Sequence, residues 1–217
     1  MKPLSLSPSE QSVLDRLKHL HYATEEQLVY WTHCHRSTVS RALSGLRDLR
    51  FVQVEKSLTP NIWHLTRKAA RFLETPLPSG NRRSSGPVMT HTVHRNQCEI
   101  LLRKDFRDFR FLNRPELYRL GLNPSHGEHA GLHAGKLFFL LLDDYLMGSD
   151  RIGQAVSRRH TAREKYCDRK ISLNWSMVFK QFFVASTHQK QIGKHRRWMT
   201  RRGIEAQLLY MPPVWAF

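Results

Sequence analysis

The sequence predicts an α/β (α+β) protein of two domains, and three observations carry that prediction. The first 75 residues combine amphipathic helical segments with one short hairpin, residues 76–90 are rich in Pro, Gly and Ser, and residues 137–142 form an apolar run that ends in two carboxylates. Such a run is too short to cross a membrane and is typical of a strand buried on both faces. The 217 residues suffice for two cores.

Positive charge dominates the composition. The chain carries 35 Lys and Arg against 18 Asp and Glu, a formal net charge of +17, and its pI is near 10.4. Such an excess predicts an anionic partner, and DNA is the leading candidate. The N-terminal residues lack the apolar core of a signal peptide, and Cys34, Cys98 and Cys167 form no CxxC pair. We therefore expect a cytoplasmic protein with reduced thiols and no membrane partner.

Residues 1–75 predict a winged helix-turn-helix domain. Capping-box patterns at residues 7–10 and 24–27 open two helices, because each places a hydroxyl side chain three residues before Glu or Gln. Three helices, a hairpin and a further helix then follow one another in the order typical of that fold. The expected elements are a helix over 8–20, helices from Thr24 and from Arg36 or Ser37, strands over 51–54 and 62–65, and a helix after Thr66.

The third helix is the predicted DNA-reading element. Val39, Leu43 and Leu46 fall at helical spacing and are expected to face the core. The opposite face carries short polar groups and guanidiniums, which reach base edges and phosphates when a helix lies in the major groove. The competing interpretation is an ordinary amphipathic helix with a solvated basic face. The predicted DNA-binding residues here are Arg36, Ser37, Thr38, Ser40, Arg41 and Arg47.

Residues 76–90 are predicted to be a linker, and residues 91–217 a second domain. The periodicity in the second domain predicts the order helix, strand, strand, strand, helix, strand, helix, strand. That order implies a mixed sheet covered on both faces.

Cations crowd one part of the second domain. Residues 151–202 hold 14 Lys and Arg against two acidic residues, Glu164 and Asp168. This density favours a track for the phosphate backbone over a routine solvated surface. The predicted DNA-binding residues of this domain are Arg158, Arg159, Arg163, Lys165, Lys194, Arg196, Arg197, Arg201 and Arg202.

Asp143 and Asp144 stand at the exit of the apolar strand. Carboxylates on a rigid element can hold a divalent cation, because hard cations prefer oxygen ligands. The same pair can equally be the solvated end of a strand or an N-cap for the next helix. The residues alone leave both interpretations open.

The two halves together resemble the replication-relaxation family, which includes the MobC-class relaxases of mobilisable plasmids. The resemblance rests on the tract ending in Trp63-His64-Leu65-Thr66, the helix start at residues 91–94, and the apolar strand entering Asp143 and Asp144. It implies a winged helix followed by a restriction-endonuclease-like domain. In that domain Glu128, Asp143 and Asp144 would be catalytic, with Asp143 and Asp144 holding Mg²⁺ or Mn²⁺. Tyr145 stands where the family's nucleases have Lys, so catalytic activity stays an open question.

Three functions follow from these features. The first is a DNA-binding protein of a mobile genetic element that recognises an origin and helps to process it in plasmid mobilisation or replication. Its partners would be duplex or single-stranded DNA, relaxosome or replication proteins, and a second copy of the chain. The alternative is a metal-dependent DNA-nicking relaxase. A winged-helix transcriptional regulator comes third, because a dimerisation domain gains nothing from so basic a segment.

Overall fold

The computed structural model describes residues 5–77, 85–119, 128–144, 148, 150–155, 178–204 and 206–212. It confirms the predicted α/β class, with helices, a three-stranded sheet and a five-stranded mixed sheet. The chain divides into two compact units, residues 1–97 (unit 1) and 98–216 (unit 2). No helix within the described ranges is long and apolar enough to span a membrane.

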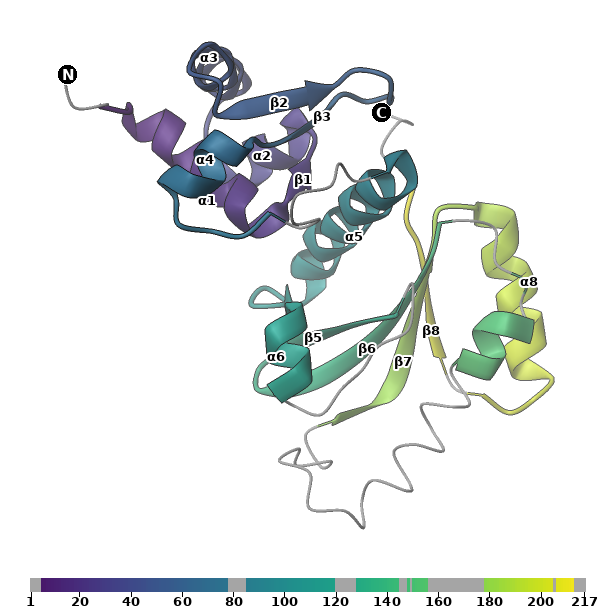
Figure 1. Ribbon diagram of the computed structural model, residues 1–217. Coiled ribbons are helices and arrows are strands. Elements are labelled where there is room, and N and C mark those ends of the chain that lie inside the picture. Colours follow the sequence, from purple (N-terminus) through teal and green to yellow (C-terminus); the bar gives the residue numbers. More distant parts are fainter. Residues whose placement is uncertain are drawn as a thin grey trace. The chain divides into compact units, whose positions relative to one another are not determined.

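Unit 1 packs helices against a small antiparallel sheet of order β1-β3-β2 (Figure 1). The predicted order of helices and hairpin is present, and the short strand β1 is an addition to it. The elements are α1 (Pro8–Leu20), β1 (Tyr22–Ala23), α2 (Glu25–Thr32), α3 (Arg36–Asp48), β2 (Val52–Glu55), β3 (Ile62–Leu65), α4 (Arg67–Phe72) and the first half of α5 (Gly86–Asp105).

Both predicted capping boxes are formed. The Ser7 hydroxyl accepts a hydrogen bond from the backbone N–H of Glu10, and the Glu10 carboxylate accepts one from the backbone N–H of Ser7. Thr24 and Gln27 exchange the equivalent pair at the start of α2. These caps satisfy backbone donors that a helix start leaves without partners. The beginnings of α1 and α2 are therefore set by local sequence.

The boundary between the units lies inside α5, after Gln97, and not in the predicted linker 76–90. Helix α5 already begins at Gly86, because Pro87 is tolerated in a first helical turn, where its missing N–H has no intrahelical partner to lose. Asn96 holds this half of α5 against the rest of unit 1. Its fully buried amide donates hydrogen bonds to the carbonyls of Leu20 (3.1 Å) and Tyr22 (2.8 Å).

Unit 2 is built around a sheet of order β4-β5-β6-β7-β8, antiparallel from β4 to β6 and parallel from β6 to β8 (Figure 1). The predicted order of helices and strands is found, with the short helix α6 as an addition between the first two strands. The elements are the second half of α5, β4 (Arg110–Phe111), α6 (Arg114–Arg119), β5 (Glu128–His133), β6 (Lys136–Asp143), a helical segment at 150–155, β7 (Val178–Ser186), α8 (Gln189–Thr200) and β8 (Ala206–Tyr210).

Strand β6 is the centre of the unit 2 core. Its residues alternate between two apolar clusters, because successive strand residues point to opposite faces. Leu137, Phe139 and Leu141 pack with Ile152 and with Met199 of α8. Residues 138, 140 and 142 pack on the other face with residues 98 and 102 of α5. The predicted cover on both faces is confirmed.

We predict that Asn96→Ala lowers the free energy of unfolding of unit 1 by about 2 kcal/mol, because the carbonyls of Leu20 and Tyr22 lose their buried donor. The midpoint of urea unfolding measures the loss. Thr92→Ala, which removes a more exposed hydrogen bond on the same helix, is the matched control and should change the value by less than about 0.5 kcal/mol. Equal losses in the two variants would contradict the assigned role of Asn96.

Candidate nucleic-acid interface

Helix α3 has one buried face and one open face. Val39, Leu43 and Leu46 are buried as predicted, and Ala42 joins them. The helix begins at Arg36 because the His35 ring accepts a hydrogen bond from the backbone N–H of Ser37 (3.3 Å) and caps the start. The resulting open face carries hydroxyl and guanidinium groups from the side of the helix opposite the core.

The predicted DNA-binding residues of α3 mostly lie on this open face. Thr38 is partly buried, and the other five are exposed. Arg41 donates to the carbonyl of Ser37 one turn earlier (3.2 Å). Within the described residues, no carboxylate forms an ion pair with Arg41 or Arg47. The five exposed residues are Arg36, Ser37, Ser40, Arg41 and Arg47.

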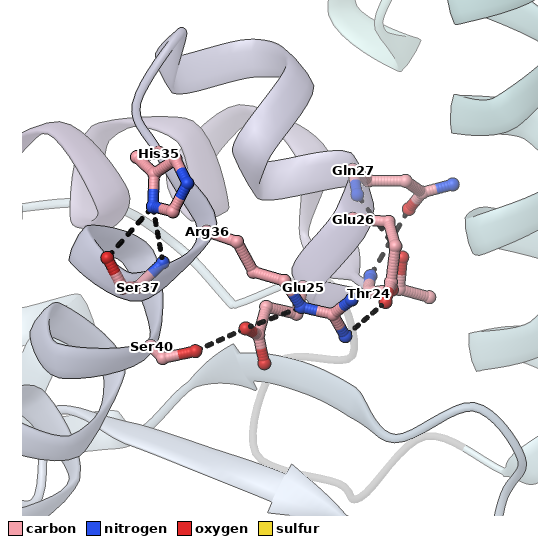
Figure 2. Close-up of polar contacts among 8 residues, drawn as sticks. All are labelled: Thr24, Glu25, Glu26, Gln27, His35, Arg36, Ser37 and Ser40. Atoms are coloured by element: carbon pink, nitrogen blue, oxygen red, sulfur yellow. Dashed lines mark hydrogen bonds and ion pairs between the residues drawn. The ribbon is translucent and has the colours of Figure 1, made fainter.

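Two carboxylates that no sequence pattern had marked as site residues lie against the start of α3 (Figure 2). Glu26 accepts a hydrogen bond from Arg36 Nη2 at 3.0 Å, and Glu25 Oε1 lies 3.5 Å from Arg36 Nε. The same Glu25 oxygen accepts a hydrogen bond from the Ser40 hydroxyl. Both glutamates stand in the first turn of α2, where the helix dipole alone would account for acidic residues. Their distance from Arg36 depends on the turn between the helices, which local patterns do not determine.

Helix α8 carries a row of cations in unit 2. Lys190, Lys194, Arg197 and Arg201 recur every three or four residues and are all exposed, so they follow one side of the helix. No carboxylate in the described part of unit 2 forms an ion pair with any of the four. We call these four residues the α8 row. Lys194, Arg197 and Arg201 were predicted DNA-binding residues, and Arg196, also predicted, is exposed nearby.

Arg202 and Trp198 take part in local packing. The guanidinium of Arg202 lies 4.0 Å from the centre of the Trp198 ring and 3.8 Å from Asp150. The Trp198 indole N–H donates to Asp150, and its ring packs so closely on Gly153 that a Cβ there would overlap it. Arg202 is thus less available to a phosphate than the α8 row. The predicted Arg158, Arg159, Arg163 and Lys165 lie outside the described residues.

Asp143 ends β6 inside the protein. Its carboxylate accepts hydrogen bonds from His195 Nε2 of α8 (2.8 Å) and from the Ser186 hydroxyl of β7 (3.2 Å). The side chains of Asp143 and His195 are both fully buried. Ser186 stands opposite Asp143 in the parallel pair β6–β7, which explains the contact. His195 occupies the apolar stripe of α8 between Ile192 and Met199, and a polar residue on a buried stripe is the signal that would have found it.

This arrangement does not fit the predicted metal site in the described part of unit 2. The Asp143 carboxylate is already hydrogen-bonded and sealed from solvent. Asp144 follows just past the end of β6 and is itself buried. Glu128 pairs with Leu141, two residues before Asp143. Among the described residues, no group of three or more His, Cys, Asp and Glu could hold a metal ion.

Comparisons with known proteins assign no family to the chain. No protein-family model and no curated protein matches the sequence. A solved structure described as "PigF with SAH" aligns with 93% of this chain at 10% sequence identity and a TM-score of 0.21. The chain spans 62% of the length of that structure. A likeness this weak carries no argument about fold or function.

We predict that His195→Ala destabilises unit 2 by about 3 kcal/mol, because removing one member of a buried polar pair leaves the other without its partner. Urea unfolding measures the change, and Lys194→Ala, the exposed neighbour on α8, is the matched control. Adding Asp143→Ala to His195→Ala should cost less than the two single losses together, since both remove the same interaction. Additive losses would show that Asp143 and His195 do not depend on each other.

Proposed function

We propose that this protein binds duplex DNA, reading a site with the open face of α3 and holding adjacent backbone with the α8 row. The observation that carries the proposal is α3 itself. It buries a complete apolar face against its own unit and presents hydroxyl and guanidinium groups on the other. Side chains of this kind on an exposed helix can reach base edges in the major groove.

The arrangement of unit 1 supports a winged helix-turn-helix. Helices α2 and α3 are joined by a short turn, and the hairpin β2–β3 follows α3 directly, in the place of a wing. Lys56 and Asn61 near the tip of this hairpin are exposed and can contact backbone beside the groove. The proposal therefore assigns base contacts to α3 and positioning contacts to the hairpin.

The α8 row supports a second, sequence-independent contact. Cations that no described carboxylate neutralises keep their full attraction for phosphate and release counterions when they bind it. A row along one side of a helix can follow a phosphate backbone over several nucleotides. The formal net charge of +17 supports the same class of partner.

The order of elements in unit 2 supports the nuclease-like fold that the resemblance implies. Apart from the short helix α6 between β4 and β5, helix, three antiparallel strands, a helical segment and a parallel strand follow one another from α5 to β7. With the resemblance to the replication-relaxation family, this leads us to propose that the DNA site is an origin of a mobile genetic element. Relaxosome or replication proteins would then be further partners of the chain.

A metal-dependent nicking activity is the second candidate function. One observation favours it: Glu128 on β5 pairs with Leu141, so the backbone brings the acidic position of the second strand near Asp143 on the third. The burial of Asp143 beneath His195 opposes it. We therefore place binding before cleavage.

We predict that the affinity for duplex DNA falls steeply with salt, with a log–log slope of about −0.9 for each phosphate contact. Replacing all four residues of the α8 row by Ala should make the slope shallower by about 0.9 for each phosphate that these residues neutralise. Fluorescence anisotropy at several salt concentrations measures this. Lys104→Ala with Arg107→Ala, two exposed cations on other parts of unit 2, is the control for charge alone. A salt-independent affinity would contradict the proposal.

We expect the protein to bind a supercoiled plasmid carrying the DNA around its own coding sequence without nicking it, in Mg²⁺, Mn²⁺ or EDTA. The reason is that the Asp143 carboxylate is occupied and buried. Agarose gels that resolve supercoiled from open circles measure nicking. Metal-dependent open circles that disappear with Glu128→Gln and with Asp144→Asn would instead establish the second candidate.

A further inference from the structure

We propose that Arg36 recognises a guanine in the DNA site and that Glu25 and Glu26 are the positioning residues that direct it there. The inference rests on the proposed DNA-binding function and deepens it. Arg36 is the first residue of α3, and its side chain is 66% exposed although it contacts both carboxylates. Figure 2 shows the guanidinium lying between the two Glu side chains.

The contacts engage Nε and Nη2 of the guanidinium and leave Nη1 without a carboxylate partner among the described residues. A guanidinium has five N–H donors in a fixed plane. Nε faces Glu25, and one Nη2 hydrogen is donated to Glu26. The second Nη2 hydrogen and the two Nη1 hydrogens remain for other acceptors. These remaining donors can reach the O6 and N7 acceptors of guanine, the commonest base-specific contact of Arg.

The carboxylates also determine which acceptor the remaining N–H groups of Arg36 prefer. Two glutamates and one arginine carry a formal net charge of −1, so Arg36 attracts a phosphate less strongly than an arginine without carboxylate partners would. The acceptors of guanine carry no formal charge, so the two carboxylates weaken their attraction to Arg36 much less. A site that repels the competing ligand gains specificity even where it gains no affinity. Glu25 and Glu26 therefore favour a base edge over the backbone at this position.

The Ser40 hydroxyl strengthens this arrangement. It donates to the same Glu25 oxygen that faces Arg36, so one carboxylate connects two positions one turn apart on the open face of α3. Glu25 is only 24% exposed, and its hydrogen bond and its ion pair both reach α3. Holding a long side chain in one orientation before binding removes part of the entropy that binding would otherwise cost. Arg41 and Arg47 have no such carboxylates in the described residues and are suited to phosphate.

The test selects binding sites from random-sequence duplexes with the full-length protein and then compares variants on the selected site. Arg36→Lys keeps the charge but loses the planar guanidinium with its several N–H donors, so we expect the preference for one guanine to fall by roughly 5- to 150-fold. Glu25→Gln with Glu26→Gln should weaken the same preference, tighten binding to a scrambled duplex and steepen the salt slope by about one phosphate contact. Glu74→Gln removes an exposed carboxylate elsewhere in unit 1 and is the charge control.

The outcomes separate this inference from the function on which it rests. Wild-type protein that binds no duplex at low salt overturns the proposed function and this inference with it. Wild-type protein that selects a site, with the same base preferences retained in Arg36→Lys, overturns the role of Arg36 alone. If the double Gln variant changes only the melting temperature and leaves base preference and salt slope as in Glu74→Gln, the carboxylates only brace α2 against α3, and their positioning role is overturned.

Discussion

The cover of β6 is the constraint on which unit 2 depends. Six consecutive apolar residues, 137–142, cannot be hydrated on either face without losing a large burial free energy. One face must therefore receive α8 and the segment at 150–155, and the other must receive α5. Once α8 is docked, its buried stripe brings His195 over the end of β6, where Asp143 accepts its N–H. The polar pair is a consequence of the apolar packing.

The same docking orients the cations of α8. A helix that buries Ile192, His195 and Met199 must present the opposite side to solvent, and the α8 row lies on that side. Packing of the buried side of α8 therefore fixes where these cations lie, and no described core residue neutralises their charge. Unit 1 uses the same physical logic: the burial of Leu43 and Leu46 turns the hydroxyls and guanidiniums of α3 outward. In both units the apolar face determines where the charged face points.

The start of α3 differs from α8 in how its charge is controlled. Lys190 and Arg197 have no carboxylate partner in the described part of unit 2, whereas Arg36 is held by two glutamates. A cation without a carboxylate partner attracts any phosphate, and a cation held by carboxylates favours an uncharged acceptor that its remaining N–H groups can reach. The distribution of acidic groups, more than that of basic ones, therefore distinguishes the two proposed kinds of DNA contact.

The sequence by itself determined the features that depend on local chemistry and periodicity. The capping boxes at Ser7 and Thr24, the buried strand β6 and the order of the elements other than β1 and α6 follow from residue types a few positions apart. Only the tertiary structure decided which residues contact each other across long distances in the sequence. Asp143 and His195 are 52 residues apart, and their contact depends on how α8 packs against β6. Glu26 and Arg36 meet across a turn, and the unit boundary falls inside α5, because packing between elements decides these contacts.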